Sequence, residues 1–195
     1  MQPSYGSSLD FVPLFNEYLT NKNPHISFAP PRGWILHRDM RFGSSYTWWG
    51  ESKERPVPHE GVDLLHYVNR NGVPSTLTSS ICLVSPIEGN VLRVSKDFLG
   101  QSVWLRHSEI TSRGTLLHSV YAHIEADTGI SEGVSVGRGG VIGTIIEKQS
   151  SGAPPGHLHL SLFFAPKSLP RDSLDWSFLS SHPDVRLIDP LQSIF

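Results

Sequence analysis

Short runs of alternating apolar and polar residues fill most of the chain between positions 34 and 164, and Pro and Gly interrupt them repeatedly. Alternation with a period of two is typical of β-strands, whose successive side chains point to opposite faces. We expect strands and turns within residues 81–95, 101–109, 115–125 and 129–147. The last of these segments is so rich in Gly that it predicts sharp corners and close strand packing. The pattern predicts a mainly β fold, a compact antiparallel β-sandwich or barrel-like core.

One segment, residues 8–22, predicts a helix, because Phe11, Phe15 and other apolar residues recur in it at helical spacing. Pro13 predicts that this helix is short. We therefore divide the chain into an N-terminal extension, residues 1–33, and a main domain, residues 34–195. Together they are expected to form one domain with irregular extensions around the core.

Composition narrows the choice of partners. The chain of 195 residues has 38% hydrophobic residues, 17% charged residues and a formal net charge of −2, so it carries no basic footprint for nucleic acid or for a membrane surface. No apolar run reaches the roughly 18 residues of a membrane span. The first residues also lack the basic and long apolar regions of a secretory signal. We expect no nucleic-acid partner and no integral membrane segment.

Two histidines lie two residues apart in "PPGHLHLSL", positions 154–162, so a strand would place His157 and His159 on one face. In "PHEGVDLL", positions 58–65, His59 and Asp63 are four residues apart around Gly61, whose missing side chain allows another backbone to come close. Two imidazoles and one carboxylate are a ligand set of catalytic zinc sites that keep an open position. Spacing alone does not decide which strand histidine would bind the metal, and a pair of half-buried structural histidines is the alternative.

A further candidate is His123 in "TLLHSVYAHIE", where strict alternation would place it on the same face as Tyr121 and opposite Ile124. It could therefore point into a cleft, although a packed strand histidine is the alternative.

The chain has a single cysteine, Cys82, so an intrachain disulfide and a cysteine-based zinc site are excluded.

These pieces follow one another in a characteristic order. The succession "HEGVDL", "VSPIEGNV", "VWLRHS", "VYAHI", "GVSVGRGGVIGTI", "GHLHLSL" and "IDPLQSIF" resembles the lysostaphin and LytM-type zinc metallopeptidases, which cut peptide bonds in bacterial cell-wall peptidoglycan. The resemblance is continuous over residues 59–165. The chain departs from the family pattern at Leu160 and Ser161, where a Phe and an acidic residue are usual, and in the long segment that precedes the terminal Asp-Pro.

The resemblance implies roles for five residues. His59, Asp63 and His159 would hold one Zn²⁺ per chain, while His123 and His157 would stand beside the ion as unligated catalytic groups. Zinc polarises a scissile carbonyl and lowers the pKa of bound water toward about 7, and neighbouring imidazoles can move the protons of the reaction.

Aromatic residues gather upstream of His59, in "SSYTWWGESKERPVPHE". Trp48 and Trp49 could line a substrate groove or merely cover the core. Tyr46 is a candidate oxyanion donor by analogy with the family. We expect these three residues to bind substrate.

The leading function is a zinc metalloendopeptidase, expected to be monomeric, that acts on peptidoglycan peptides in the periplasm or outside the cell. The alternative is a non-catalytic LytM-type module that binds and regulates another cell-wall hydrolase. Such modules typically lack zinc ligands, whereas this sequence keeps all of them. A third possibility is a carrier domain, whose hairpins also have glycine at their corners. Such a domain would need an exposed Lys in the hairpin turn, and no Lys occurs there in this sequence.

Overall fold

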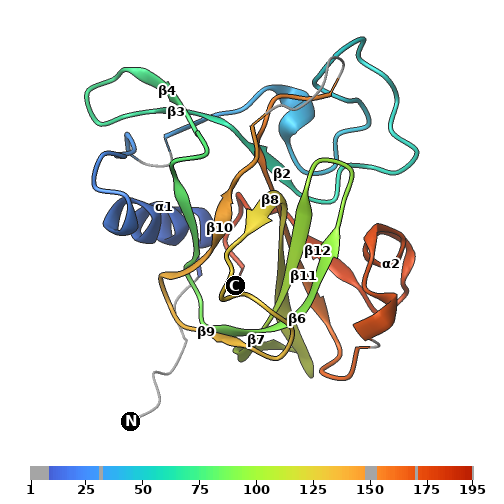
Figure 1. Cartoon of the computed structure of the whole chain (residues 1–195). Helices are drawn as coiled ribbons and strands as arrows, with labels where there is room; N and C mark the ends of the chain where they lie inside the picture. Colours follow the sequence, from blue (N-terminus) through green and yellow to red (C-terminus); the bar gives the residue numbers. More distant parts are fainter. Residues whose placement is uncertain (1–8, 31–32, 148–152, 170, 195) are drawn as a thin grey trace.

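The structure of the chain, a computed structural model, describes residues 9–30, 33–147, 153–169 and 171–194. Antiparallel strands dominate these residues, and the two α-helices among them are short (Figure 1). The predicted mainly β fold is therefore confirmed. The main sheet is an open path of strands rather than a closed barrel.

The helices are α1 (Phe11–Lys22) and α2 (Trp176–Ser181), with single 3₁₀ turns at Arg38–Met40 and Arg171–Ser173. The first strands are β1 (Trp34–Ile35), β2 (Val62–Leu64), β3 (His66–Val68), β4 (Pro74–Thr76), β5 (Cys82–Ser85) and β6 (Gly89–Lys96). The later strands are β7 (Gln101–Ser112), β8 (Thr115–Ala126), β9 (Ser135–Val136), β10 (Gly140–Ile145), β11 (Leu158–Ala165) and β12 (Arg186–Ile188). Strands β5 to β10 begin within the segments that the alternating pattern predicted, whereas α2, β12 and the short strands β1 to β4 lie outside them.

The large sheet runs in the order β12-β11-β8-β7-β6-β9, and three shorter strands join it at its sides. Strand β2 pairs with β11, and β10 pairs with both β5 and the end of β8. A separate small sheet, in the order β1-β3-β4, lies beside it. Strands β5 and β6 are consecutive but do not pair with each other, since β5 pairs with β10 and β6 with β7 and β9.

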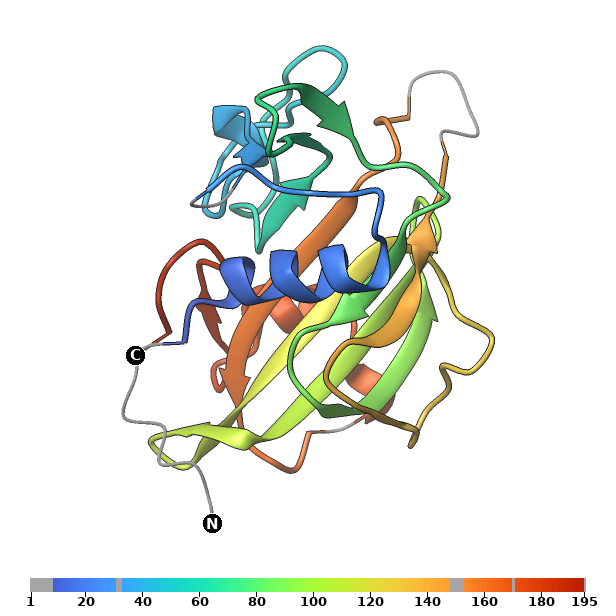
Figure 2. The same cartoon turned by 90° about the vertical axis from the view of Figure 1, so that its left-hand side faces the viewer.

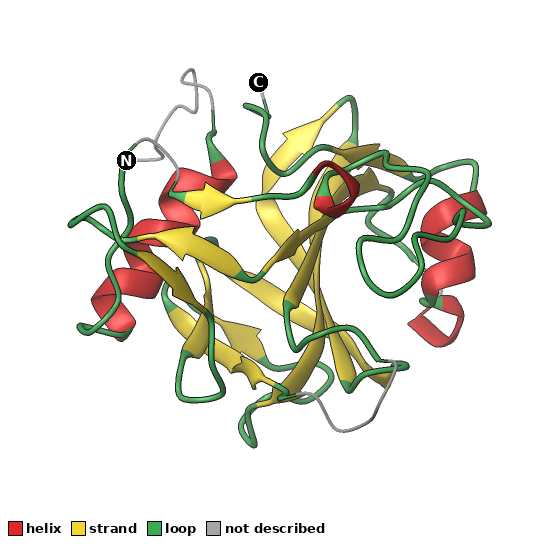
Figure 3. Cartoon of the chain, turned by 90° about the horizontal axis from the view of Figure 1, so that it is seen from above, coloured by secondary structure: helices red, strands yellow, loops and turns green. Residues whose placement is uncertain are grey.

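Two apolar clusters cover the sheet. The larger cluster contains Phe11, Phe15 and Leu19 of α1, and the smaller one contains Phe178 and Leu179 of α2. The two helices accordingly lie on opposite sides of the strands (Figures 2 and 3). Neither helix approaches the length and apolar character that crossing a membrane would require.

Helix α1 is the short N-terminal helix that the sequence predicted, and Pro13 does not interrupt it. It runs without a break over Phe11–Lys22, because Pro13 falls in the first turn, where a backbone N–H has no partner within the helix. Its buried face joins the main core, and Trp34 Nε1 donates a hydrogen bond of 2.8 Å to Asn16 Oδ1. The helix therefore packs as part of the domain core.

Strand β8 departs from strict alternation at His123. In the pairing with β7, Gln101 faces Ile124 and Val103 faces Tyr121, so two residues of β8 oppose one residue of β7 in a β-bulge. The backbone of His123 is left-handed, with φ of 64°. The expectation that His123 shares the face of Tyr121 is therefore wrong. Tyr121 and Ile124 both lie in the larger cluster, whereas the extra residue His123 stacks on Trp176 on the other side.

Candidate metal centre

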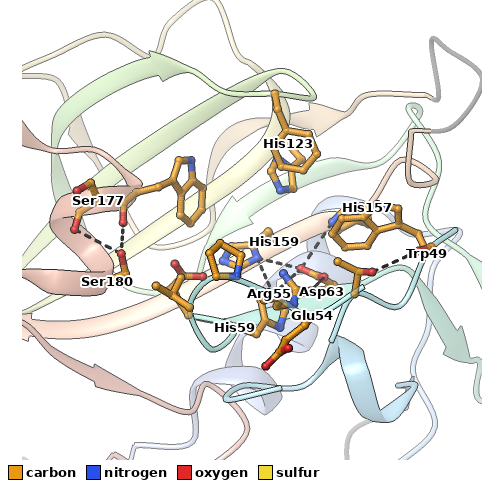
Figure 4. Close-up of a pocket in the computed structure, with 16 residues that line it drawn as sticks. Trp49, Glu54, Arg55, His59, Asp63, His123, His157, His159, Ser177 and Ser180 are labelled. Carbon is orange, nitrogen blue, oxygen red and sulfur yellow. Dashed lines mark hydrogen bonds and ion pairs between the residues drawn. The ribbon is translucent and has the colours of Figure 1, made fainter. Parts of the chain in front are cut away.

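Three buried side chains converge at one edge of the sheet. His59 Nε2 lies 3.0 Å from His159 Nδ1 and 3.1 Å from Asp63 Oδ1, and His159 Nδ1 lies 2.9 Å from Asp63 Oδ1. All three residues are at most 4% exposed. The structure thus brings together the three residues that the sequence nominated as metal ligands, and these three could hold a metal ion (Figure 4).

Sheet pairing sets this arrangement. Asp63 on β2 is the antiparallel partner of His159 on β11, so their side chains leave neighbouring strands side by side. Gly61 permits the approach, because a Cβ built there would collide with the carbonyl oxygen of Leu160 and come within 2.8 Å of His159 Nε2. The glycine between the two upstream candidates therefore has the role that its position indicated, close contact with another backbone.

Each of the three side chains is oriented by a further contact. His59 Nδ1 lies 3.0 Å from the carbonyl oxygen of Arg41, a contact that makes Nδ1 the protonated nitrogen and leaves Nε2 as an acceptor. Trp48 Nε1 donates a hydrogen bond of 2.6 Å to Asp63 Oδ2, which leaves Oδ1 directed at the histidines. His159 Nε2 lies 2.8 Å from Ser161 Oγ. Outer contacts of this kind orient metal ligands in proteins.

Burial and charge keep the set in its ligating forms. Burial alone would raise the pKa of Asp63, but its interactions with His59, His157 and His159 hold that pKa well below its usual range. Burial lowers the pKa of His159 to about 3, against the opposing effect of Asp63. At neutral pH the site therefore presents a carboxylate and a neutral imidazole, the forms that bind metal.

The donor set fits zinc. Tetrahedral zinc with bonds of about 2.0–2.1 Å places its ligand atoms about 3.3 Å apart, and the three observed separations lie between 2.9 and 3.1 Å. A bare carboxylate oxygen and imidazole lone pairs, buried face to face, repel one another unless a cation or a proton lies between them. Two imidazoles and one carboxylate also match a ligand type that zinc takes in catalytic sites.

His123 and His157 stand beside this set. Their ring centroids are 5.0 Å apart, and His157 Nε2 lies 3.6 Å from Asp63 Oδ1. His157 Nδ1 lies 2.8 Å from the carbonyl oxygen of Pro155, so Nδ1 carries the proton and Nε2 faces the site. Burial is the main cause that lowers the pKa of His157, which keeps the ring neutral at pH 7.

The five residues line one cleft of about 520 Å³. Trp49 lies toward one end of it, and Ser177 and Ser180 of α2 lie toward the other (Figure 4). Trp176 of α2 packs against both His123 and His159, with centroid distances of 6.2 and 5.0 Å. None of the described residues of the N-terminal extension lines this cleft.

The three aromatic candidates upstream of His59 separate in space. Trp49 lines the cleft, whereas Trp48 lies behind it, hydrogen-bonded to Asp63 and edge-on to His157 at 5.2 Å. Tyr46 is 46% exposed, pairs with Glu54 in an isolated bridge, and does not line the cleft. The structure does not bring Tyr46 to the metal centre.

Sequence reasoning missed three other groups near the cleft. Arg55 places Nη2 3.8 Å from Asp63 Oδ2 and its guanidinium 5.2 Å from the ring centroid of Trp49. Phe98, although 66% exposed, packs its ring 4.6 Å from that of His123. Trp176 comes from the unusually long segment before the terminal Asp-Pro, and that length was the only signal that pointed to it.

No family model and no curated protein matches this chain. Among solved structures, it is similar to a putative M23 peptidase from Pseudomonas aeruginosa, with 18% identity, 93% of this chain and 60% of that chain covered, and a TM-score of 0.41. It is also similar to the catalytic domain of the antimicrobial peptidase lysostaphin from Staphylococcus simulans, with 14% identity, 81% and 90% covered, and a TM-score of 0.46. A zinc-containing peptidase from Vibrio cholerae is 18% identical over 68% of this chain and 37% of its own, with a TM-score of 0.41.

Proposed function

We propose that this protein is a zinc-dependent metalloendopeptidase that hydrolyses peptide bonds of bacterial cell-wall peptidoglycan. One observation carries the proposal: three buried donor atoms converge within 3.1 Å of one another in an open cleft, beside two imidazoles that are not part of the set. The substrate class, and action in the periplasm or outside the cell, rest on the order of sequence motifs that resembles the lysostaphin and LytM-type peptidases.

In this proposal His59, Asp63 and His159 hold one zinc ion. Zinc bound there would polarise the scissile carbonyl and make a water molecule acidic enough to attack near neutral pH. Proton movement falls to His157 and His123. His157 has its Nδ1 engaged by the Pro155 carbonyl, so its Nε2 is the atom that accepts a proton and passes it to the leaving amine.

The cleft suits an extended peptide with small side chains. Its floor carries the charged and imidazole groups, and its rim is aromatic, with Trp49 and Phe98 among its lining residues. Aromatic side chains offer a large apolar contact area to a bound peptide. Gly- and Ala-rich peptides are the substrates to test first because the order of sequence motifs resembles that of cell-wall peptidases.

The test combines metal content with turnover. Wild type and Asp63→Ala are purified, supplied with zinc and freed of excess, and zinc is measured by elemental analysis next to digestion of purified peptidoglycan. We expect about one zinc per chain and released peptides for wild type, and little of either for Asp63→Ala, because a buried ligand is lost. Wild type without zinc would overturn the proposal. Wild type with zinc but without cleavage would instead favour the regulatory module.

A further inference from the structure

We propose that Asp97 is a positioning residue for His123, and that its carboxylate fixes both the backbone and the ring of this histidine at the edge of the cleft. The inference deepens the proposed function and rests on it, because it concerns a group assigned there to proton transfer. Asp97 lies in the turn between β6 and β7, and nothing in its local sequence pattern points to the site.

The first observation concerns the backbone of His123. Among the described non-glycine residues, only Arg113 and His123 have a positive φ, and a left-handed backbone is unfavourable for a residue with a side chain. Asp97 Oδ2 accepts a 3.0 Å hydrogen bond from the backbone N–H of His123. This bond, made across 26 residues of sequence, stabilises the bulge that turns the histidine ring away from the Tyr121 face and into the cleft.

The second observation concerns the ring. Asp97 Oδ1 lies 3.2 Å from His123 Nδ1, with side chains only 1% and 5% exposed. The contact is too bent to be a well-formed hydrogen bond, and Nδ1 has no other hydrogen-bond partner in the part of the chain that the structure describes. Catalytic hydrogen bonds often tighten only when substrate binds. A proton held on Nδ1 by Asp97 leaves the Nε2 lone pair free for the reaction.

The carboxylate itself is held firmly. Oδ1 accepts hydrogen bonds of 2.9 and 2.7 Å from the backbone N–H groups of Leu99 and Gly100, and Oδ2 accepts one of 2.7 Å from Ser102 Oγ. Burial alone would raise the pKa of Asp97, but its interactions with His123 outweigh burial, so the pKa is lowered and the group is ionised. A role limited to capping the turn explains the bonds to residues 99 and 100 but neither contact with His123.

The variant Asp97→Asn tests the role. Both carboxylate oxygens accept from backbone N–H groups, so an amide in either orientation places its NH₂ against one of them. The matched control is Asp127→Asn, an exposed turn aspartate whose Oδ1 accepts from the Gly129 N–H and which does not line the cleft. Steady-state kinetics use an internally quenched peptide of Gly and Ala residues, and zinc content is measured in parallel.

For Asp97→Asn we expect kcat to fall by about 10² or more, with KM within about threefold of wild type and zinc retained, because orientation of an acid-base group acts in the transition state. Asp127→Asn should keep the wild-type kcat. An Asp97→Asn kcat within about threefold of wild type would overturn the inference.

A second measurement does not depend on the variant folding or on turnover. Nitrogen-15 NMR of the zinc-loaded wild type, at a pH where the His123 ring is neutral, should show the ring proton on Nδ1. A proton on Nε2 would overturn the inference. If wild type cleaves no peptide, the proposed function fails while this spectrum still decides whether Asp97 positions His123.

Discussion

Asp63 and His159 are direct cross-strand partners, and their facing atoms, Oδ1 and Nδ1, lie 2.9 Å apart. The two strands that carry them, β2 and β11, belong to the main sheet, and the other edge of β11 pairs His159 with Ala122 of β8. A shift of one residue in the register of β2 would turn Asp63 to the opposite face. The candidate metal centre therefore depends on strand register as much as on the identity of its residues.

The first prediction concerns Gly61→Ala. The added Cβ would collide with the Leu160 carbonyl, so β2 and β11 must move apart. We expect a loss of about 1–3 kcal/mol in the free energy of unfolding, as for overpacked cores, together with reduced zinc content. Thermal unfolding followed by circular dichroism, with elemental analysis of zinc, measures both effects.

Gly137→Ala is the matched control. A Cβ at Gly137 meets nothing within 4 Å, and its φ is not in the left-handed range, so the same substitution should leave stability and zinc content close to wild type. A Gly61→Ala protein as stable and as rich in zinc as this control would show that β2 and β11 do not pack as closely as described.

Trp48→Phe tests the support of the metal ligand from behind. The substitution keeps an aromatic ring but removes the Nε1 donor that binds Asp63 Oδ2 at 2.6 Å. Loss of such a partner typically weakens metal binding by about 10- to 100-fold, and a chelator competition titration would measure the change. Trp49→Phe is the control, because Trp49 lines the cleft without bonding to Asp63. Equal zinc affinity in the two variants would contradict the role of Trp48.

His157→Ala and His123→Ala should separate catalysis from metal binding. Neither ring belongs to the three-residue set, so both variants should keep about one zinc per chain. Loss of a general acid or base typically costs about 10² to 10⁴ in rate, and kcat for peptide cleavage should fall by that order. A variant that loses its zinc would show that the ligand assignment is wrong.

The alternation of apolar and polar residues was enough to predict most of the fold. It placed β7 and β8 and the mainly β class correctly, because burial of one face imposes a period of two on the sequence. The bulge at His123 was not predictable in this way. The hydrogen bond that stabilises the bulge is made to Asp97, 26 residues away, and a periodic pattern contains no trace of such a contact.

In the candidate site, too, some features could be predicted from the sequence and others depend on tertiary contacts. His59 and Asp63 form a local motif that could be read directly, and the expectation that they converge with a strand histidine rests on residue type. Which histidine meets Asp63 depends on a pairing across 96 residues. Trp176 reaches the site from the short helix α2, more than 100 residues after Asp63 in the sequence, and such a position depends on packing that no local spacing records.

The last prediction concerns acid stability. His107 is fully buried between the Glu88 carbonyl, 2.8 Å from Nδ1, and Ser119 Oγ, 2.8 Å from Nε2. Burial lowers its pKa to about 4, and the hydrogen bond to Glu88 opposes this only in part. An unfolded histidine titrates near pH 6.5, so between about pH 6.5 and 4 the unfolded chain binds more protons than the folded one. Stability is therefore complete above this window and falls as the pH decreases through it.

We expect His107 to account for a loss of about 3 kcal/mol in the free energy of unfolding between pH 6.5 and 4. Urea unfolding of wild type and His107→Asn at several pH values measures it. The variant should be less stable at pH 7, because it loses the bond to Ser119, yet its stability should fall less as the pH decreases. His118, whose pKa burial lowers to about 3, is present in both proteins, so its contribution differs between them only by the smaller effect of the His107 charge on it. Parallel pH profiles for the two proteins would mean that His107 binds its proton equally well in the folded and unfolded chain, which would contradict its burial as a neutral ring.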